Sequence, residues 1–262
     1  MMSAMQQAKI DIQTHGFLKS LPFFDGLPEE DMKALLQASI IRNFDKHRNL
    51  FHQGDRADQL LIIIDGWVKL YRHTTEGEEC VIAIFTRGDI LGEAAIIMGA
   101  SYPFSAETAE ETKFIEIPGQ ILRERAAQNH KIMSRIMSSM SRELRNVQME
   151  NEHLAIMSAP QRVGCLLLQL SSGLLGKGAS FPFPYDKSLA ASRLGMKAET
   201  FSRALAQLKP LGVTVKGPEV TIKDFSNLVE YVCNHCSSLP GECRGSRNES
   251  CENTECKSRT AN

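Results

Sequence analysis

Residues 185–224 constrain the fold more than any other stretch of this sequence: YDKSLAASRLGMKAETFSRALAQLKPLGVTVKGPEVTIKD. Asp186 can cap a helix through KSLAASRL, and Gly195 can supply the left-handed residue at which that helix stops. A second helix, AETFSRALAQL, follows after a short turn and has Phe201 on its apolar side. The stretch GVTVKGPEVTI then alternates apolar and polar residues around a Gly-Pro pair. The segment therefore predicts two short helices, a tight turn between them and a two-stranded wing, which together make a winged helix-turn-helix.

The charge of this segment differs from that of the whole chain, whose formal net charge is −1. Residues 185–216 carry six cations against two anions, a local balance of 6 − 2 = +4. The cations are Lys187, Arg193, Lys197, Arg203, Lys209 and Lys216, and the anions are Asp186 and Glu199. A local patch of cations is what contact with nucleic-acid phosphates requires.

The second helix of this segment carries polar side chains of the kinds that read base edges. Arg203 can donate two hydrogen bonds to guanine, Glu199 can accept one from cytosine, and Ser202 can contact a base. Lys197 and Thr200 lie beside them in the sequence and complete the predicted DNA-binding set. The alternative is a charged, solvated helix face on a three-helix fold. The order of helix, glycine turn, helix and wing favours DNA recognition.

Residues 41–117 have a different texture, in which short apolar runs alternate with turn signals. The runs QLLIIIDGWVKLYRH, CVIAIF and KFIEI are separated by QGD, EG and RGD. Short strands at this spacing predict a compact antiparallel barrel or roll. Residues 1–40 before them are helical in pattern.

Residues 118–157 turn helical and stay so, and their later part carries a narrow apolar seam. The seam residues, at steps of 4, 4, 4, 3 and 7, are Ile132, Ile136, Met140, Leu144, Val147 and Leu154. A seam this narrow is better matched by a partner helix than by a broad core, which predicts a homodimer. Asn151 also falls on the seam, where a lone buried Asn can fix the register of the dimer. The alternative is a helix packed on its own domain.

Several classes of protein are disfavoured by what the sequence lacks. The longest apolar runs, such as LLIII at 60–64, are far shorter than the ~20 residues of a membrane span. The N-terminus lacks the pattern of a secretory signal, so we expect a cytoplasmic protein with no membrane partner. No paired acid/base motif, nucleophile elbow or phosphate-binding glycine loop is present, so we expect no enzyme activity. In a reducing compartment the seven cysteines are not expected to form a disulfide framework.

The order of roll, long helix and winged helix-turn-helix resembles the CRP/FNR family of bacterial transcription regulators over about residues 17–230. PYDKSLAASRLGMKAETFSRAL is especially similar to the FNR side, which includes regulators that respond to nitric oxide and low oxygen. That branch carries a Glu, two residues, then Ser-Arg, as do Glu199, Ser202 and Arg203 here. The cyclic-AMP branch has Arg before the Glu, where this chain has Ala198, and Gly in place of Ser202. The resemblance implies a TTGAT-type half-site, read as a palindrome by the dimer, with RNA polymerase as a further partner.

These regions and the resemblance together predict an α+β protein in four parts. An antiparallel β-roll sensor domain, cupin-like and of the cyclic-nucleotide-binding type, spans 1–125, and a dimerisation helix spans 126–157. The winged helix-turn-helix DNA-binding domain spans 158–230, and a cysteine-rich tail spans 231–262.

The resemblance also indicates where an effector would bind in the roll. Family members that bind a cyclic nucleotide carry Gly-Glu near the start of the phosphate cradle and Arg-Ser/Thr-Ala near its end. Gly92, Glu93 and Ser105 are in place here, but Phe104 stands at the arginine position. Because a buried phosphate without a cation is costly, cyclic nucleotide is disfavoured, and Gly92 and Glu93 are interpreted as structural. Haem is another option in this branch, and the candidate ligands, none of them in a motif, are His15, His47, His52, His73, His130 and His153.

The C-terminal tail concentrates five of the seven cysteines within residues 233–256, at the spacing C-x2-C-x6-C-x7-C-x4-C. This clustering favours an iron–sulfur cluster of the [4Fe–4S] type, because such clusters are held by thiolates. The predicted ligands are Cys233, Cys236, Cys243 and Cys251, with Cys256 spare. Structural zinc and free thiols without a metal are the alternatives, and the family context of a regulator that needs a redox input favours the cluster.

Overall fold

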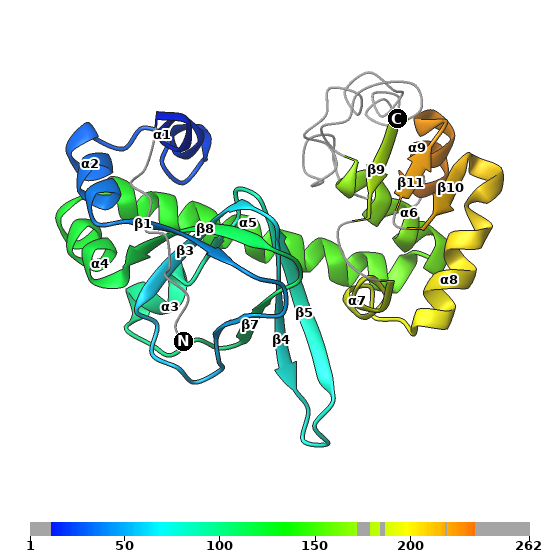
Figure 1. The fold of residues 1–262 in the computed structure, drawn as a ribbon, viewed down its shortest axis with the longest axis horizontal. Coiled ribbons are helices and arrows are strands. Elements are labelled where there is room, and N and C mark those ends of the chain that lie inside the picture. Colours follow the sequence, from blue (N-terminus) through cyan, green and yellow to red (C-terminus); the bar gives the residue numbers. More distant parts are fainter. Residues whose placement is uncertain (1–11, 172–178, 184–186, 218, 234–262) are drawn as a thin grey trace, which may run out of the picture. The chain divides into compact units, whose positions relative to one another are not determined.

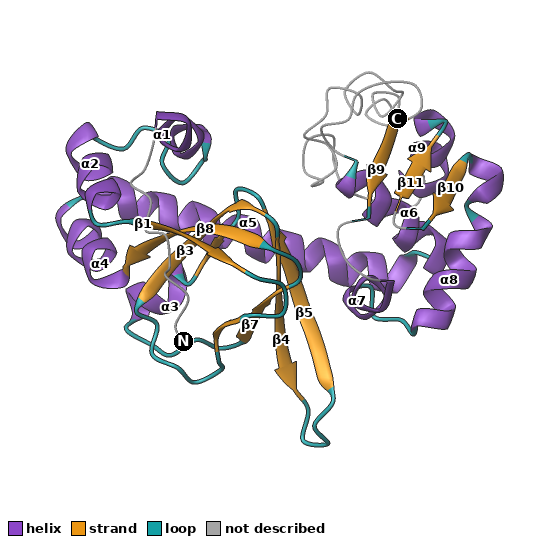
Figure 2. Ribbon diagram, in the orientation of Figure 1, coloured by secondary structure: helices purple, strands orange, loops and turns teal. Residues whose placement is uncertain are grey.

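The protein is described from a computed structural model that covers residues 12–171, 179–183, 187–217 and 219–233 (Figure 1). The chain divides into two compact units, Met1–Arg142 and Glu143–Asn262. The division falls inside the longest helix of the described residues, α5 (His130–Ile156). Strands and helices occur in both units (Figure 2), which confirms the predicted α+β class.

The first unit is built, in its described residues, on two four-stranded antiparallel sheets with the strand orders β1-β8-β3-β6 and β2-β7-β4-β5. The strands are β1 (Ile40–Phe44), β2 (Asn49–Phe51), β3 (Gln59–Asp65), β4 (Trp67–His73), β5 (Glu79–Thr86), β6 (Ile90–Leu91), β7 (Ser105–Thr108) and β8 (Thr112–Pro118). The helices are α1 (Ile12–Ser20), α2 (Glu29–Gln37), α3 (Glu93–Met98), α4 (Gly119–Gln128) and the start of α5. The predicted antiparallel roll is therefore confirmed.

Strand β8 shows how the sequence divides this unit into two cores. Successive side chains of a strand point to opposite faces of the sheet. Phe114 joins the core between the two sheets, with residues such as Leu61 and Phe85. Ile115 and Ile117, on the opposite face, join a second core that the helices build against the sheet. The apolar side chains on both faces of β8 are thus explained by burial on both sides of the sheet.

The second unit contains the end of α5, further helices and a small antiparallel sheet of order β10-β11-β9. Its elements are α6 (Ala159–Leu170), β9 (Ala179–Pro182), α7 (Lys187–Arg193), α8 (Ala198–Gln207), a 3-10 turn (Lys209–Leu211), β10 (Val213–Lys216), β11 (Glu219–Ile222) and α9 (Phe225–Cys233). Helix α6 packs on α8 and α9. Gly164 permits this close approach, because a Cβ at Gly164 would lie 2.6 Å from Cγ2 of Val232.

The wing has one strand more than the sequence predicts. Residues 179–182 form β9 and pair with β11, with Phe181 opposite Val220. Both of these side chains are buried. A four-residue strand that contains a proline carries too little periodicity to be recognised by pattern, so its partner in the fold decides its structure.

The helical pattern that the sequence predicts from residue 118 onward is interrupted at Asn129. The backbone of Asn129 is extended, with φ −131° and ψ 110°, and α4 ends there. Its side-chain amide donates to buried Asp31, and its Oδ1 accepts a 2.9 Å hydrogen bond from the backbone nitrogen of Lys131. An Asn side chain competes for backbone hydrogen bonds in this way at helix starts. Helix α5 consequently begins at His130, later than the predicted 126.

Among the described residues, no helix has both the length and the apolar character that crossing a membrane requires.

Candidate nucleic-acid interface

The turn between α7 and α8 forms as the glycine at its centre predicts. Gly195 adopts a left-handed conformation with φ +61°. The Gly195 nitrogen donates to the Ser192 carbonyl, and the Met196 nitrogen donates to the Ala191 carbonyl, each at 3.0 Å. These are the two hydrogen bonds of a Schellman helix end. They stop α7 and let α8 begin within a few residues, so the two helices form one compact motif.

Helix α8 is amphipathic, and its inner side holds it against the rest of the unit. Phe201, Ala204 and Leu208 are buried, at 0–2% exposure. Ala190 and Ala191 of α7 are also buried, and their small side chains let α8 pack close to α7. The apolar side of α8 is therefore buried inside the domain, and its other side is accessible to solvent or a ligand.

The outer side of α8 carries the side chains that the sequence predicts to read DNA. Glu199 and Arg203 are about three-quarters exposed and pair with each other across one helical turn. The hydroxyl of Ser202 is exposed and donates to the Ala198 carbonyl at 3.0 Å. Lys197, which caps the helix, and Thr200 are exposed as well. The arrangement offers a guanidinium, a carboxylate and a hydroxyl on one accessible surface, which is the donor and acceptor set of base-edge readout.

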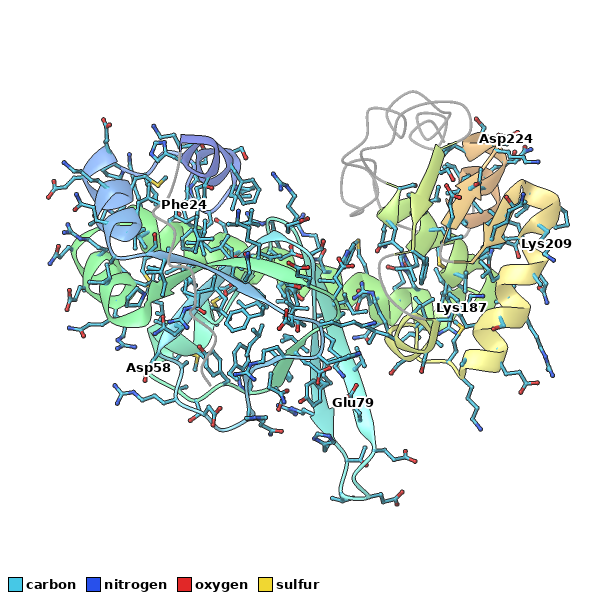
Figure 3. All side chains as sticks on the ribbon, viewed as in Figure 1. Phe24, Asp58, Glu79, Lys187, Lys209 and Asp224 are labelled. Carbon is cyan, nitrogen blue, oxygen red and sulfur yellow. The ribbon has the colours of Figure 1, made fainter. Side chains whose placement is uncertain are left out.

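One of the six predicted phosphate-binding cations is not part of this surface. The side chain of Arg193 is only 8% exposed, and its Nη2 lies 2.6 Å from Oε1 of Glu150 on α5. Arg193 is therefore an internal partner and not a free positive charge. The other five cations are exposed: Lys187, Lys197, Arg203, Lys209 and Lys216. Figure 3 labels Lys187 at the start of α7 and Lys209 just after α8.

Two contacts that the sequence did not predict hold the turn between α7 and α8. Glu150 pairs with Arg193 across 43 positions of sequence, and Nη1 of Arg162 on α6 donates to the Leu194 carbonyl at 2.8 Å. Neither contact has a local signal, because the partners are brought together only by folding.

At the start of α5, the exposed apolar residues lie one position later in the chain than the predicted seam residues. Ile132 and Ile136 are at most 1% exposed and belong to the core of the first unit, so they cannot face a partner helix. Met133 and Met137 are exposed instead. The remaining predicted seam residues are exposed, including Asn151. The corrected stripe, with steps of 4, 3, 4, 3, 4 and 3, comprises Met133, Met137, Met140, Leu144, Val147, Asn151 and Leu154.

The predicted effector residues of the roll are each engaged by neighbouring groups. Gly92 has φ +96°, and a Cβ there would lie 3.0 Å from the Gln59 carbonyl oxygen. Glu93 accepts a 3.2 Å hydrogen bond from the hydroxyl of Ser139 on α5. These contacts support the structural interpretation of Gly92 and Glu93.

The other two effector residues are similarly occupied. The guanidinium of Arg72 lies over the ring of Phe104, 4.7 Å from its centroid. The Arg72 Nε also donates to the Pro103 carbonyl at 2.9 Å. The hydroxyl of Ser105 accepts a 3.0 Å hydrogen bond from the Gln53 nitrogen. The side chain at the expected arginine position is thus an aromatic ring stacked with a cation that has partners of its own.

The predicted metal ligands fall where the structure gives no description. Helix α9 is described to Cys233, whose side chain is not, and Cys236, Cys243 and Cys251 lie outside the described residues. Within the described residues, no three or more His, Cys, Asp or Glu side chains are grouped so that they could hold a metal ion.

Known proteins share both units of this chain. Residues 41–129 match the cyclic nucleotide-binding domain, and residues 161–231 match the Crp-like helix-turn-helix domain. The anaerobic regulatory protein of Pasteurella multocida is 32% identical over 189 residues, which cover 71% of this chain and 69% of that protein. This chain belongs to the CRP/FNR family. Another CRP/FNR relative, the transcriptional activator protein anr of Pseudomonas aeruginosa, is 29% identical over 77% of this chain and 84% of its own length.

A solved structure shares the fold of this chain. The crystal structure of a protein from Ruegeria pomeroyi has a TM-score of 0.64 and 34% identity, and the match covers 83% of this chain and 96% of that one. Helix-turn-helix regulators of the CRP/FNR family bind DNA and function as dimers. The chain is accordingly a DNA-binding transcription regulator and not an enzyme, as the sequence predicts.

Proposed function

We propose that this regulator is of FNR type and binds TTGAT-like palindromes as a homodimer. The observation that carries the proposal is the outer side of α8, where Glu199, Ser202 and Arg203 are exposed opposite buried Phe201. In this assignment Arg203 contacts guanine, Glu199 accepts from cytosine and Ser202 adds a further base contact. Exposed Lys197 and the other exposed cations of the motif contact phosphates. The names of the relatives, which include anaerobic regulatory proteins, support the FNR type.

The corrected stripe of α5 is the proposed dimer surface. Leu144 and Leu154 are exposed by 60% and 51%, which is costly for a single chain in water. The alternating steps of 4 and 3 match the heptad repeat of a two-stranded coiled coil. Asn151 occupies one seam position, where a polar residue selects register at some cost in stability.

The signal is proposed to be redox state or a diatomic gas, either oxygen or nitric oxide, with RNA polymerase as the downstream partner. Two observations support this: relatives named for anaerobic regulation, and five cysteines within residues 233–256. A [4Fe–4S] cluster held by the tail thiolates would supply a redox centre there. Haem bound by a histidine, or structural zinc or free thiols in the tail, are the alternatives. Helix α9 leads from the DNA-binding unit directly into this tail.

DNA recognition is tested by a gel shift on a TTGAT-N4-ATCAA duplex under anaerobic and aerobic conditions. Wild-type protein should bind in one of the two states, and Arg203→Ala should reduce affinity by about tenfold or more, because a bidentate contact to guanine is lost. Lys113→Ala, a change on the roll strand β8, is the matched control and should bind as wild type. Equal binding by wild type and Arg203→Ala in both states would refute the proposed readout.

The signal is tested by an absorption spectrum and metal analysis of anaerobically purified protein. A broad shoulder that bleaches in air indicates an iron–sulfur cluster, and a Soret band indicates haem. Replacement of Cys236 and Cys243 by Ser should remove the shoulder and leave the roll folded. If neither band is present and the protein holds stoichiometric zinc or no metal, an iron–sulfur cluster is contradicted. A tail with zinc or free thiols then remains.

A cyclic-nucleotide-gated regulator is the second candidate, because residues 41–129 match the cyclic nucleotide-binding domain. The side chains around the expected arginine position argue against it, because Phe104 supplies no cation and the guanidinium of neighbouring Arg72 stacks on that ring and donates to the Pro103 carbonyl. Calorimetric titration with cyclic AMP decides the question: micromolar binding would favour this candidate over the redox signal.

A further inference from the structure

The turn that joins α7 to α8 is held in place by the two helices that precede it in the chain. The Arg193 guanidinium pairs with Glu150 of α5, and the Leu194 carbonyl accepts from Arg162 of α6. Gly195 faces Leu154 of α5, where a Cβ would meet Cδ2 at 3.5 Å. Three consecutive residues of the turn are thus attached to α5 or α6, all within one compact unit.

The Glu150–Arg193 pair differs in kind from the pair on the DNA-reading surface. The Arg193 side chain is 8% exposed, whereas both members of the Glu199–Arg203 pair are about three-quarters exposed. An exposed pair is screened by water and contributes little to structure. A desolvated guanidinium that loses its carboxylate leaves an uncompensated charge inside the protein, which is strongly unfavourable. The Glu150–Arg193 pair, whose guanidinium is desolvated although its carboxylate is 43% exposed, therefore constrains geometry more than the Glu199–Arg203 pair does.

Glu150 also has a particular position on α5. It lies directly before the stripe residue Asn151 and three residues after the stripe residue Val147. In the heptad defined by the stripe, this is the position that flanks the seam and that usually makes contacts between helices. Here its carboxylate is directed to Arg193 of the same chain. One residue therefore borders the proposed dimer surface and holds the DNA-reading motif.

We infer that the Glu150–Arg193 pair positions α8 relative to the dimer helix, and so sets which half-site spacing the regulator accepts. This inference rests on the proposed function, because it requires a dimer that reads a palindrome. Helix α8 begins at Ala198, only five residues after Arg193, and the turn between them is closed by its own hydrogen bonds. A shift of the turn against α5 consequently moves α8 as a body. Recognition helices of a dimer must enter successive major grooves, so such a shift changes the spacing that fits.

The test compares operators whose two half-sites are separated by three, four or five base pairs. The variants are Glu150→Gln, Arg193→Gln and the exchange Glu150→Arg with Arg193→Glu. Glu143→Gln is the matched control, because Glu143 lies one heptad earlier on α5 and accepts from Asn146 of its own helix. Lys187→Gln removes an exposed cation from α7 and serves as the reference for a lost phosphate contact.

Both single variants are expected to lose about five- to tenfold in affinity for the best operator and much of the preference for its spacing. Because no phosphate contact is removed, the dependence of affinity on salt should match that of wild type. Lys187→Gln should weaken binding to all spacings alike and lower the salt slope by about one unit. The exchange variant should recover spacing preference, and Glu143→Gln should behave as wild type. Sedimentation should show an unchanged dimer in every variant.

Three results would overturn the inference. Unchanged affinity and spacing preference in Glu150→Gln would show that the pair does not position α8, while an effect of Arg203→Ala would still uphold the proposed function. A reduced salt slope in Arg193→Gln would make Arg193 a phosphate contact. Should Arg193→Gln unfold, as thermal melting would reveal, Glu150→Gln decides alone, because an amide oxygen at this 43% exposed position can still accept a hydrogen bond from Arg193 while the charge is removed. Absence of operator binding by wild type would instead refute the proposed function itself.

Discussion

The two ends of α5 are anchored in different ways. At its start, Ile132 and Ile136 are buried in the apolar core of the first unit. Near its end, an ion pair joins the half-exposed carboxylate of Glu150 to the desolvated guanidinium of Arg193 in the helix-turn-helix. Apolar burial is non-directional, whereas a charge-assisted hydrogen bond requires particular distances and angles. The roll end of α5 is thus held by packing, and the DNA-binding end is held in addition by a contact that specifies orientation.

Helix α5 also carries two separate apolar surfaces. Ile132 lies in the core, and Met133, the next residue, belongs to the exposed stripe that continues to Leu154. The first surface stabilises the fold of one chain, and the second is available to a partner. Substitutions at the two surfaces should therefore have separable effects on folding and on dimerisation.

A charge in the middle of the stripe is expected to have the largest effect. In Leu144→Glu the dimer would bury two carboxylates without partners, so its dissociation constant should rise by about a thousandfold or more. Leu144 is 60% exposed in the single chain, so the monomer should melt at nearly the wild-type temperature. Sedimentation equilibrium measures the first quantity and circular dichroism the second. An unchanged dissociation constant would place the dimer surface elsewhere.

Adjacent truncations at the start of α5 should separate the two surfaces directly. Ile132→Ala creates a cavity in the core and should lower the free energy of unfolding by about 3 kcal/mol. Met133→Ala, one residue further on, should change it by less than about 0.5 kcal/mol and weaken the dimer severalfold. Chemical denaturation of dilute protein measures the free energy of unfolding of both variants. Equal losses of stability would show that Ile132 and Met133 are not distinguished by burial.

Replacement of the polar seam residue is expected to have the smallest effect, and of opposite sign. Asn151→Leu should strengthen the dimer by about tenfold, because a polar residue at a seam position costs stability. It should also permit other registers, so affinity for the palindrome should not improve in proportion. Sedimentation and gel shifts on the same preparation measure the two effects. A weaker dimer would show that Asn151 makes a hydrogen bond worth more than its desolvation.

The helix-turn-helix was predictable from the sequence because its determinants are local. Gly195 marks the left-handed residue that ends α7, and Phe201 marks the inner side of α8, and the structure places both as predicted. The order of roll, long helix and winged domain followed in the same way from changes in periodicity. The exposed side chains of α8 could be named for the same reason, since a 3.6-residue period assigns inner and outer sides without reference to the rest of the chain.

The misplaced residues share one physical cause. Ile132 and Met133 are both apolar, and a seam drawn through either continues to Met140 at acceptable helical steps, so periodicity cannot choose between them. The sheet and helices of the first unit choose, by burying Ile132. Arg193 has the composition of a DNA-binding cation, and only its distance to Glu150 shows otherwise.

The sequence by itself determined the kind of protein: a roll, a long helix and a DNA-reading motif, each specified by residues that lie close together in the chain. Tertiary structure decided which of two neighbouring apolar positions faces the core and which cation of the motif is paired internally. The reason is that burial and ion pairing depend on partners far away in sequence, 43 positions in the case of Glu150 and Arg193. No local pattern encodes such a partner, so the link between the long helix and the DNA-reading motif emerges only when the chain is folded.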